Sequence, residues 1–163
     1  MKKILILNTG GTFNKIYNPT NGLLEIDNTS PALKYISSKW LCDFEIKNIL
    51  GKDSLEMTEK DRLELLNSIN QSEHTHIIVI HGTDTMHLST ACLADAKLEK
   101  IVVFTGAMVP YSIDPVEATA NLASAYGYVQ ALEKDGVYIA MNAVLSSYDK
   151  VKKDRKQGKF TLV

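Results

Sequence analysis

Short, continuous runs of apolar residues alternate with amphipathic helical patterns along this 163-residue chain, and this alternation constrains the fold more than any other feature. Runs that are apolar throughout are typical of parallel strands covered on both faces. We therefore expect an α/β fold, a three-layer sandwich around a mainly parallel sheet. The predicted strands cover residues 3–8, 43–50, 76–81, 101–105 and 137–143.

Helix start and stop signals lie between these runs. Ser30 is a predicted N-cap and Pro31 a predicted first helical residue, before a helical pattern over residues 32–41. Thr58 is the predicted N-cap of a second helix. Asp114, followed by a proline and a glutamate, predicts the start of another helix, and Gly136 is expected to end that helix as its C′ residue.

One segment breaks the alternation of strand and helix. Residues 11–28 are polar and contain Pro19 and Gly22, both typical of turns. We expect this segment to form a hairpin or a flexible flap between the first strand and the first helix.

Composition excludes several classes of function. Lys plus Arg is 18 and Asp plus Glu is 19, and this balance argues against a nucleic-acid-binding protein. No apolar stretch approaches the ~20 residues of a membrane span. Cys42 and Cys92 form no Cys-x-x-Cys pair, so a reduced, cytoplasmic chain is expected. His74 and His76 alternate as a metal pair would, but ordinary histidines are the favoured interpretation because no zinc pattern accompanies them.

Hydroxyl and carboxylate groups follow the predicted strands. Right-handed crossovers place the carboxyl ends of parallel strands at one edge of the sheet, where ligands of such folds bind. Thr12 follows Gly10 and Gly11, which suits a nucleophile beside anion-stabilising amides or, alternatively, a Gly-Gly turn that the threonine caps. Thr83 and Asp84 follow the third run, where Asp84 could bind an ammonium group, orient a proton-transfer residue or cap the helix expected over residues 84–98.

These loops resemble those of the L-asparaginase family of bacterial type. The resemblance extends from Lys3 to Lys152 and concerns the N-terminal domain of that family. It implies a single Rossmann- or flavodoxin-like domain over residues 1–163, with no counterpart of the family's C-terminal domain. The matching motifs are Thr9-Gly10-Gly11-Thr12, Asp53-Ser54 followed by Met57, His81-Gly82-Thr83-Asp84-Thr85-Met86, and Thr105-Gly106-Ala107-Met108.

The resemblance implies a role for each matching residue. Thr12 corresponds to the nucleophile, which attacks the side-chain amide carbon and forms an acyl-enzyme. Thr83 and Asp84 correspond to a pair that handles protons together with a lysine. Asp84 also corresponds to the group that binds the α-amino group of the substrate, and Ser54 to the serine that binds its α-carboxylate. Backbone N–H groups near Gly11 and Thr83 are expected to face the oxyanion.

Two roles rest on less direct matches. Lys152 aligns best with the family's lysine, with Lys150 and Lys153 as rivals. The position expected for a flap tyrosine holds a leucine, and Tyr17 is the candidate to replace it. The expected substrate-binding residues are Gly11, Asp53, Ser54, Leu55, Gly82, Thr83, Asp84, Ala107 and Met108.

The resemblance implies an amidohydrolase that cleaves the side-chain amide of asparagine or a related small amide. It implies no cofactor and no metal ion, no nucleic-acid or membrane partner, and assembly into a homodimer or higher homo-oligomer. Family members draw their remaining substrate contacts from the C-terminal domain of a neighbouring subunit. The alternative is a catalytically weak or inactive amino-acid-binding or regulatory module, or a subunit that needs a separate partner chain.

Overall fold

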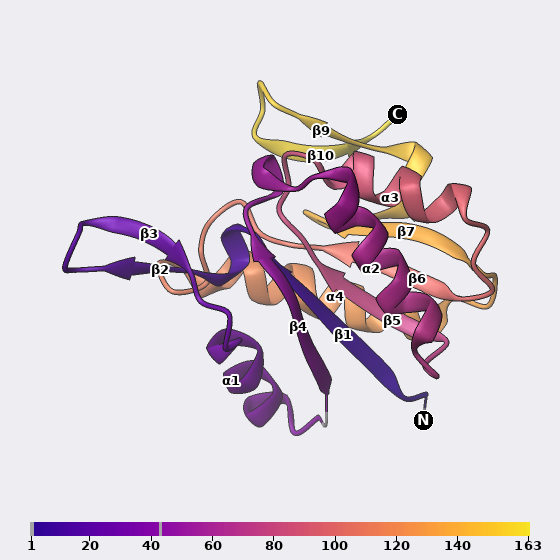
Figure 1. Cartoon of the computed structure of the whole chain (residues 1–163), viewed down its shortest axis with the longest axis horizontal. Coiled ribbons are helices and arrows are strands. Elements are labelled where there is room, and N and C mark those ends of the chain that lie inside the picture. The colour runs from indigo at the N-terminus through magenta and orange to yellow at the C-terminus, as the bar shows by residue number, and fades with distance from the viewer. Residues whose placement is uncertain (1, 43) are drawn as a thin grey trace.

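A six-stranded sheet forms the centre of the computed structural model, which describes residues 2–42 and 44–163 (Figure 1). The strand order is β4-β1-β5-β6-β7-β8, and only β8 runs antiparallel to its neighbour. This confirms an α/β fold with a mainly parallel sheet. Asp43, the expected first residue of the second strand, lies outside the described residues. The strands are β1 (Ile4–Gly10), β4 (Glu45–Lys52), β5 (His76–Ile80), β6 (Ile101–Thr105), β7 (Gly136–Met141) and β8 (Val144–Ser147).

Helices cover both faces of this sheet and enclose two hydrophobic cores. Successive strand residues point to opposite faces, so β1 places Ile6 in one core and Leu7 in the other. The helices α1 (Pro31–Trp40) and α4 (Pro115–Ala131) pack on the Ile6 face. The helices α2 (Glu59–Gln71) and α3 (Met86–Asp95) pack on the Leu7 face. The three layers are therefore helices, sheet and helices.

Two of the predicted helix caps are confirmed. The Thr58 hydroxyl accepts a hydrogen bond from the N–H of Asp61 at 3.3 Å, and the Asp61 carboxylate accepts one from the N–H of Thr58 at 2.7 Å. Asp114 accepts a hydrogen bond from the N–H of Val116 at 3.0 Å. Each cap satisfies a backbone donor that has no partner within its helix.

Two predicted helix ends are wrong, and the predicted N-cap Ser30 holds its position without a side-chain cap. Ser30 precedes α1 but makes no side-chain cap, because its backbone is left-handed (φ 55°) and its hydroxyl accepts a hydrogen bond from Asn8 Nδ2 at 2.8 Å. Gly136 is the first residue of β7, since α4 already ends at Ala131. Asp84 caps no helix, because α3 is shorter than expected and starts after Thr85.

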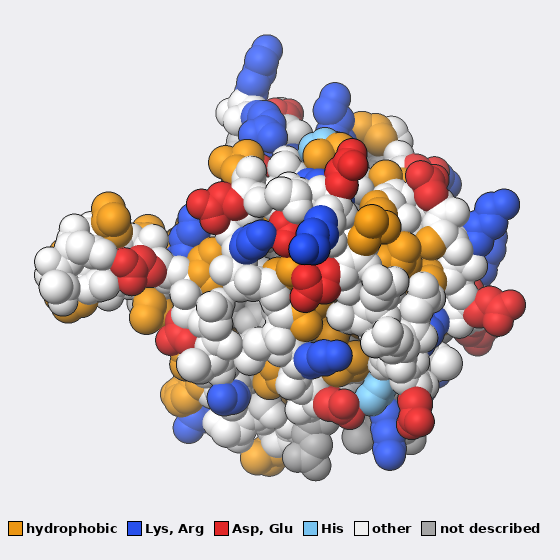
Figure 2. All heavy atoms as spheres, viewed as in Figure 1, with side chains coloured by type: hydrophobic (Ala, Val, Ile, Leu, Met, Phe, Trp, Pro, Cys, Tyr) orange, Lys and Arg blue, Asp and Glu red, His pale blue; other side chains and the backbone are white. Residues whose placement is uncertain are grey.

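Two hairpins lie outside the main sheet. The strands β2 (Lys15–Asn18) and β3 (Leu23–Ile26) form the hairpin expected between the first strand and the first helix. This flap hairpin stands clear of the body of the molecule (Figures 1 and 2). The strands β9 (Val151–Asp154) and β10 (Lys159–Leu162) form a second hairpin that the sequence patterns did not predict. None of the described helices is both long and apolar enough to cross a membrane.

Candidate active site

Glycines join the loops that follow β1, β4 and β5. Gly11 has a left-handed backbone (φ 72°), and a Cβ atom built on it would lie 2.5 Å from the backbone nitrogen of Gly82. A Cβ atom on Gly82 would in turn lie 2.6 Å from the Cβ of Ser54. No side chain fits at either contact, so these glycines let the three loops meet directly. Thr12 and Thr83 each follow a glycine of this contact, which brings their loops together.

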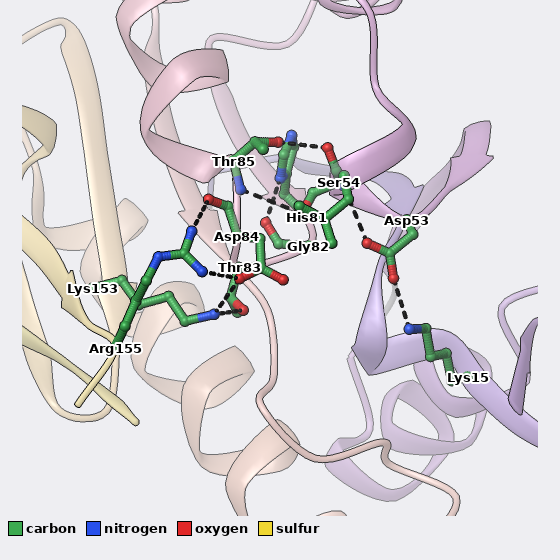
Figure 3. A network of polar contacts seen from close by, with 11 residues as sticks. Lys15, Asp53, Ser54, His81, Gly82, Thr83, Asp84, Thr85, Lys153 and Arg155 are labelled. Atoms are coloured by element: carbon green, nitrogen blue, oxygen red, sulfur yellow. Dashed lines mark hydrogen bonds and ion pairs between the residues drawn. The ribbon is translucent and has the colours of Figure 1, made fainter. Parts of the chain in front are cut away.

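A lysine, a threonine and an aspartate form a hydrogen-bonded group beside this contact. Lys153 Nζ donates to Thr83 Oγ1 at 2.8 Å and to Asp84 Oδ1 at 2.9 Å (Figure 3). Thr83 is buried, and the side chain of Lys153 is only 15% exposed. The hydrogen bond from Lys153 is the main reason why the pKa of Asp84 is lowered. The arrangement offers a hydroxyl whose proton an uncharged amine could take.

Lys153 occupies the position that the sequence comparison assigned to Lys152, and this is a correction. Side chains alternate along a strand, so Val151 and Lys153 face inward from β9 while Lys152 faces solvent. Lys150 is also exposed. The error arose because the register of the β9–β10 hairpin, which decides between the three lysines, was not predicted.

Arg155 belongs to the same group, although sequence reasoning missed it. Its Nη1 donates to Asp84 Oδ1 at 2.9 Å and its Nη2 to the main-chain oxygen of Asp84 at 3.2 Å. Its place two residues after Lys153, on the same side of a hairpin, was the only signal in the sequence.

Thr12 begins a short 3₁₀ turn and is half-buried. Among the residues that the structure describes, its hydroxyl has no hydrogen-bond partner. The turn is held by Asn14, whose Nδ2 donates to Asn8 Oδ1 at 2.8 Å and to the Gly10 oxygen at 2.7 Å. Gly11 cannot serve an oxyanion as expected, because its N–H already donates to the Lys52 oxygen at 3.0 Å.

The loop after β4 brings a buried serine to the glycine contact. Thr85 binds Ser54 twice, with its N–H donating to Ser54 Oγ at 3.4 Å and its hydroxyl to the Ser54 oxygen at 2.7 Å. Asp53 Oδ2 lies 2.7 Å from Lys15 Nζ of the flap hairpin. Burial works to raise the pKa of Asp53, but the hydrogen bonds from Lys15 and from the Leu55 N–H outweigh it, so the pKa is lowered. The Leu55 side chain itself is exposed.

The remaining predicted site residues lie further from this group. Tyr17 is 60% exposed on β2, opposite Leu24, and its hydroxyl lies over its own hairpin, 4.0 Å from where a Cβ of Gly22 would be. The structure therefore does not bring Tyr17 to Thr83. Ala107 is buried, and the Met108 N–H donates to both carboxylate oxygens of Glu117 at 3.0 Å.

His81 connects the loop after β5 to α3 through both of its ring nitrogens. Its Nδ1 donates to the Gly82 oxygen at 2.7 Å, so its Nε2 accepts from the Ser89 hydroxyl at 2.8 Å. Burial lowers the pKa of His81 to about 4. His74 lies elsewhere, with its Nε2 3.1 Å from Glu45. Within residues 2–42 and 44–163, no three His, Cys, Asp or Glu side chains are placed to hold a metal ion.

A cavity of about 240 Å³ opens next to the group formed by Thr83, Asp84 and Lys153. Arg155 and Phe160 complete part of its wall. A larger hollow, of about 720 Å³, lies at the opposite edge of the sheet, around His74, and contains none of these residues. The smaller cavity therefore borders the candidate substrate site on the side of Thr83, Asp84 and Lys153, whereas Thr12 and Ser54 are not part of its wall.

Comparisons with known proteins agree with this architecture. A family model described as "Asparaginase, N-terminal" matches residues 3–159. A search among curated proteins found no match. The thermostable L-asparaginase from Thermococcus kodakarensis superposes with a TM-score of 0.83 at 23% identity, over 100% of this chain and 51% of that one. A probable cytoplasmic L-asparaginase from Campylobacter jejuni superposes with a TM-score of 0.82 at 28% identity, over 99% of this chain and 53% of that one. The chain thus spans about half the length of these relatives.

Proposed function

Since the chain belongs to the asparaginase family, we propose that it is an amidohydrolase with Thr12 as its nucleophile. Its substrate is the side-chain amide of asparagine or of a related small amide. The observation that carries the proposal is the pair of hydrogen bonds that Lys153 Nζ donates to Thr83 Oγ1 and to Asp84 Oδ1. This group stands at the glycine contact that joins the loops of Thr12 and Thr83.

The reaction needs a base to activate a hydroxyl, because a threonine is a weak nucleophile at neutral pH. The Thr12 oxygen attacks the amide carbon, and its proton passes through the Thr83 hydroxyl to the uncharged Lys153 amine. Lys153 returns that proton to the nitrogen as the C–N bond breaks and ammonia leaves. Water then attacks the acyl-Thr12 ester by the same proton route, which releases the acid and restores Thr12.

The tetrahedral intermediate needs hydrogen-bond donors for its oxyanion. With the Gly11 N–H engaged, the N–H of Thr83 is the better candidate, since it has no partner among the described residues. Ser54 and Asp84 anchor the rest of the substrate. The buried Ser54 is held by Thr85, which suits a residue that fixes a ligand in one orientation.

The test is coupled ammonia release by the purified chain with asparagine, glutamine and small amides. Thr12→Ala should abolish release, because the nucleophile is lost. Thr20→Ala is the matched control, since Thr20 lies exposed in the turn of the flap hairpin. Release that survives in Thr12→Ala would contradict the proposed nucleophile.

A second candidate function is a module that binds an amino acid without turning it over. One observation favours it: Arg155 already binds the carboxylate of Asp84. A rise in melting temperature with ligand but no ammonia release would support this alternative.

We further propose that residues 1–163 act as one domain of the N-terminal type within a homodimer or higher homo-oligomer. The family's use of contacts from a neighbouring subunit supports this assembly. A reduced, cytoplasmic setting fits Cys42 and Cys92, which are both free.

A further inference from the structure

Asp84 is the carboxylate of the candidate cavity, and two basic side chains bind it. Lys153 and Arg155 both donate to the same oxygen, Oδ1, at 2.9 Å. Arg155 also donates to the Asp84 main-chain oxygen at 3.2 Å, so the guanidinium forms hydrogen bonds with both the side chain and the main chain of Asp84 (Figure 3). In the proposed mechanism Lys153 is the uncharged base, so Arg155 is the cation that pairs with the Asp84 carboxylate and neutralises it.

Among the described residues that line the cavity, Asp84 is the one carboxylate. Asp53 is the next carboxylate that influences Asp84, and it is already paired with Lys15 at 2.7 Å. The cavity wall adds Lys152 to Lys153 and Arg155. The field in the cavity therefore favours an anion and opposes a further cation.

An ammonium group would have to share Asp84 with Arg155, which binds Oδ1, while Oδ2 has no hydrogen-bond partner among the described residues. A substrate with an α-ammonium group would have to share Asp84 with the guanidinium or displace it. The side chain of Arg155 is 65% exposed, so water and salt weaken its ion pair and displacement is possible at a modest cost. Arg155 therefore weakens the binding of substrates that carry an ammonium group and does not block the site.

We propose that Arg155 is a specificity-determining residue that shifts this site from α-amino amides toward amides carrying a carboxylate but no ammonium group. Succinamate, which is asparagine without its α-amino group, represents this substrate class. The inference rests on the proposed amidohydrolase function and names the substrate class of that same site.

The experiment measures kcat/KM for succinamate and for asparagine with the unmodified chain and with Arg155→Ala. The unmodified chain should prefer succinamate. Arg155→Ala should raise the ratio of asparagine to succinamate about three- to tenfold, with the difference shrinking in high salt. Lys156→Ala is the matched control, because Lys156 is the adjacent exposed cation and its side chain makes no contact with Asp84. It should leave the ratio unchanged.

An unchanged ratio in Arg155→Ala, with activity intact, would overturn the specificity role while the hydrolase proposal stands. If no form releases ammonia, calorimetric titration with the two acids, succinate and aspartate, measures the same preference as binding affinity. The two acids differ in the ammonium group, and no reaction is needed. The unmodified chain should then prefer succinate, and Arg155→Ala should move the preference toward aspartate. Binding of neither acid, or the same preference in both forms, would overturn the proposal.

Discussion

A single lysine distinguishes the candidate machinery from the basic surface around it. Lys153 is held against Thr83 and Asp84, whereas Lys152 faces solvent one residue earlier. Lys153→Met keeps the length and the apolar stem of the side chain but removes the amine. We expect it to lower kcat about 10²- to 10⁴-fold, the range typical of a lost general base. Lys150→Met, at an exposed lysine outside the cavity wall, should leave kcat nearly unchanged. Steady-state ammonia release measures both, and equal losses in the two variants would contradict the role of Lys153.

His81 links residue chemistry to the stability of the fold. Burial lowers its pKa from 6.5 to about 4, so the unfolded chain binds more protons than the folded one between these values. The stability that the uncharged His81 gives to the fold is fully present above pH 6.5 and is lost as the pH falls toward 4. The free energy of unfolding falls by up to about 3 kcal/mol over this range. Urea unfolding at a series of pH values measures the slope. His81→Gln should flatten it in this window, and a slope as steep as in the unmodified chain would contradict the assignment.

Contacts between loops, more than the strands themselves, bring the site together at the scale of elements. Gly82 is the point at which the loop after β5 contacts Ser54, and a Cβ on Gly82 would lie 2.6 Å from the Ser54 Cβ. Gly82→Ala should destabilise the fold by about 1–3 kcal/mol, as overpacking does, and should weaken substrate binding. The measurement is urea unfolding together with KM.

Gly127 provides the control for that substitution. It lies within α4, and a Cβ there would meet no atom within 4 Å. Gly127→Ala should therefore stabilise the fold by up to about 1 kcal/mol. A Gly82→Ala variant as stable as Gly127→Ala would show that the loops do not depend on the close contact.

The elements differ in how far the sequence could define them. The five parallel strands and the Thr58 cap were predictable because they rest on local patterns, such as a continuous apolar run or a hydroxyl three residues before an acid, whereas β8 was not predicted. The end of α4 was not, since Gly136 suits either a helix end or the start of a strand. Lys153 could not be chosen over Lys150 and Lys152, because the β9–β10 hairpin was not predicted. The strand register that turns Lys153 inward depends on packing of Val151 and Phe160 against the core, which is a tertiary effect.

At the scale of the whole molecule, a site built at one sheet edge lies open on one side. The cavity of about 240 Å³ is lined by the loop after β5, α3, β7 and the β9–β10 hairpin, and the flap hairpin stands away from the body. If a second copy completes the site, specific activity should fall on dilution as the assembly dissociates. Light scattering and ammonia release over the same range of concentrations test this. A monomer whose specific activity stays constant on dilution would contradict the need for a partner copy.

The central claim is that amide cleavage proceeds through an ester on Thr12. Hydroxylamine added to the reaction tests it most directly, because an acyl-enzyme can pass its acyl group to this nucleophile in place of water. We expect a hydroxamate to form at the expense of the acid, in the same proportion for two substrates that share the acyl group but differ in the leaving amine. Both products should vanish in Thr12→Ala. Ammonia release with no hydroxamate, or with a proportion that changes with the leaving group, would contradict a common acyl-Thr12 intermediate.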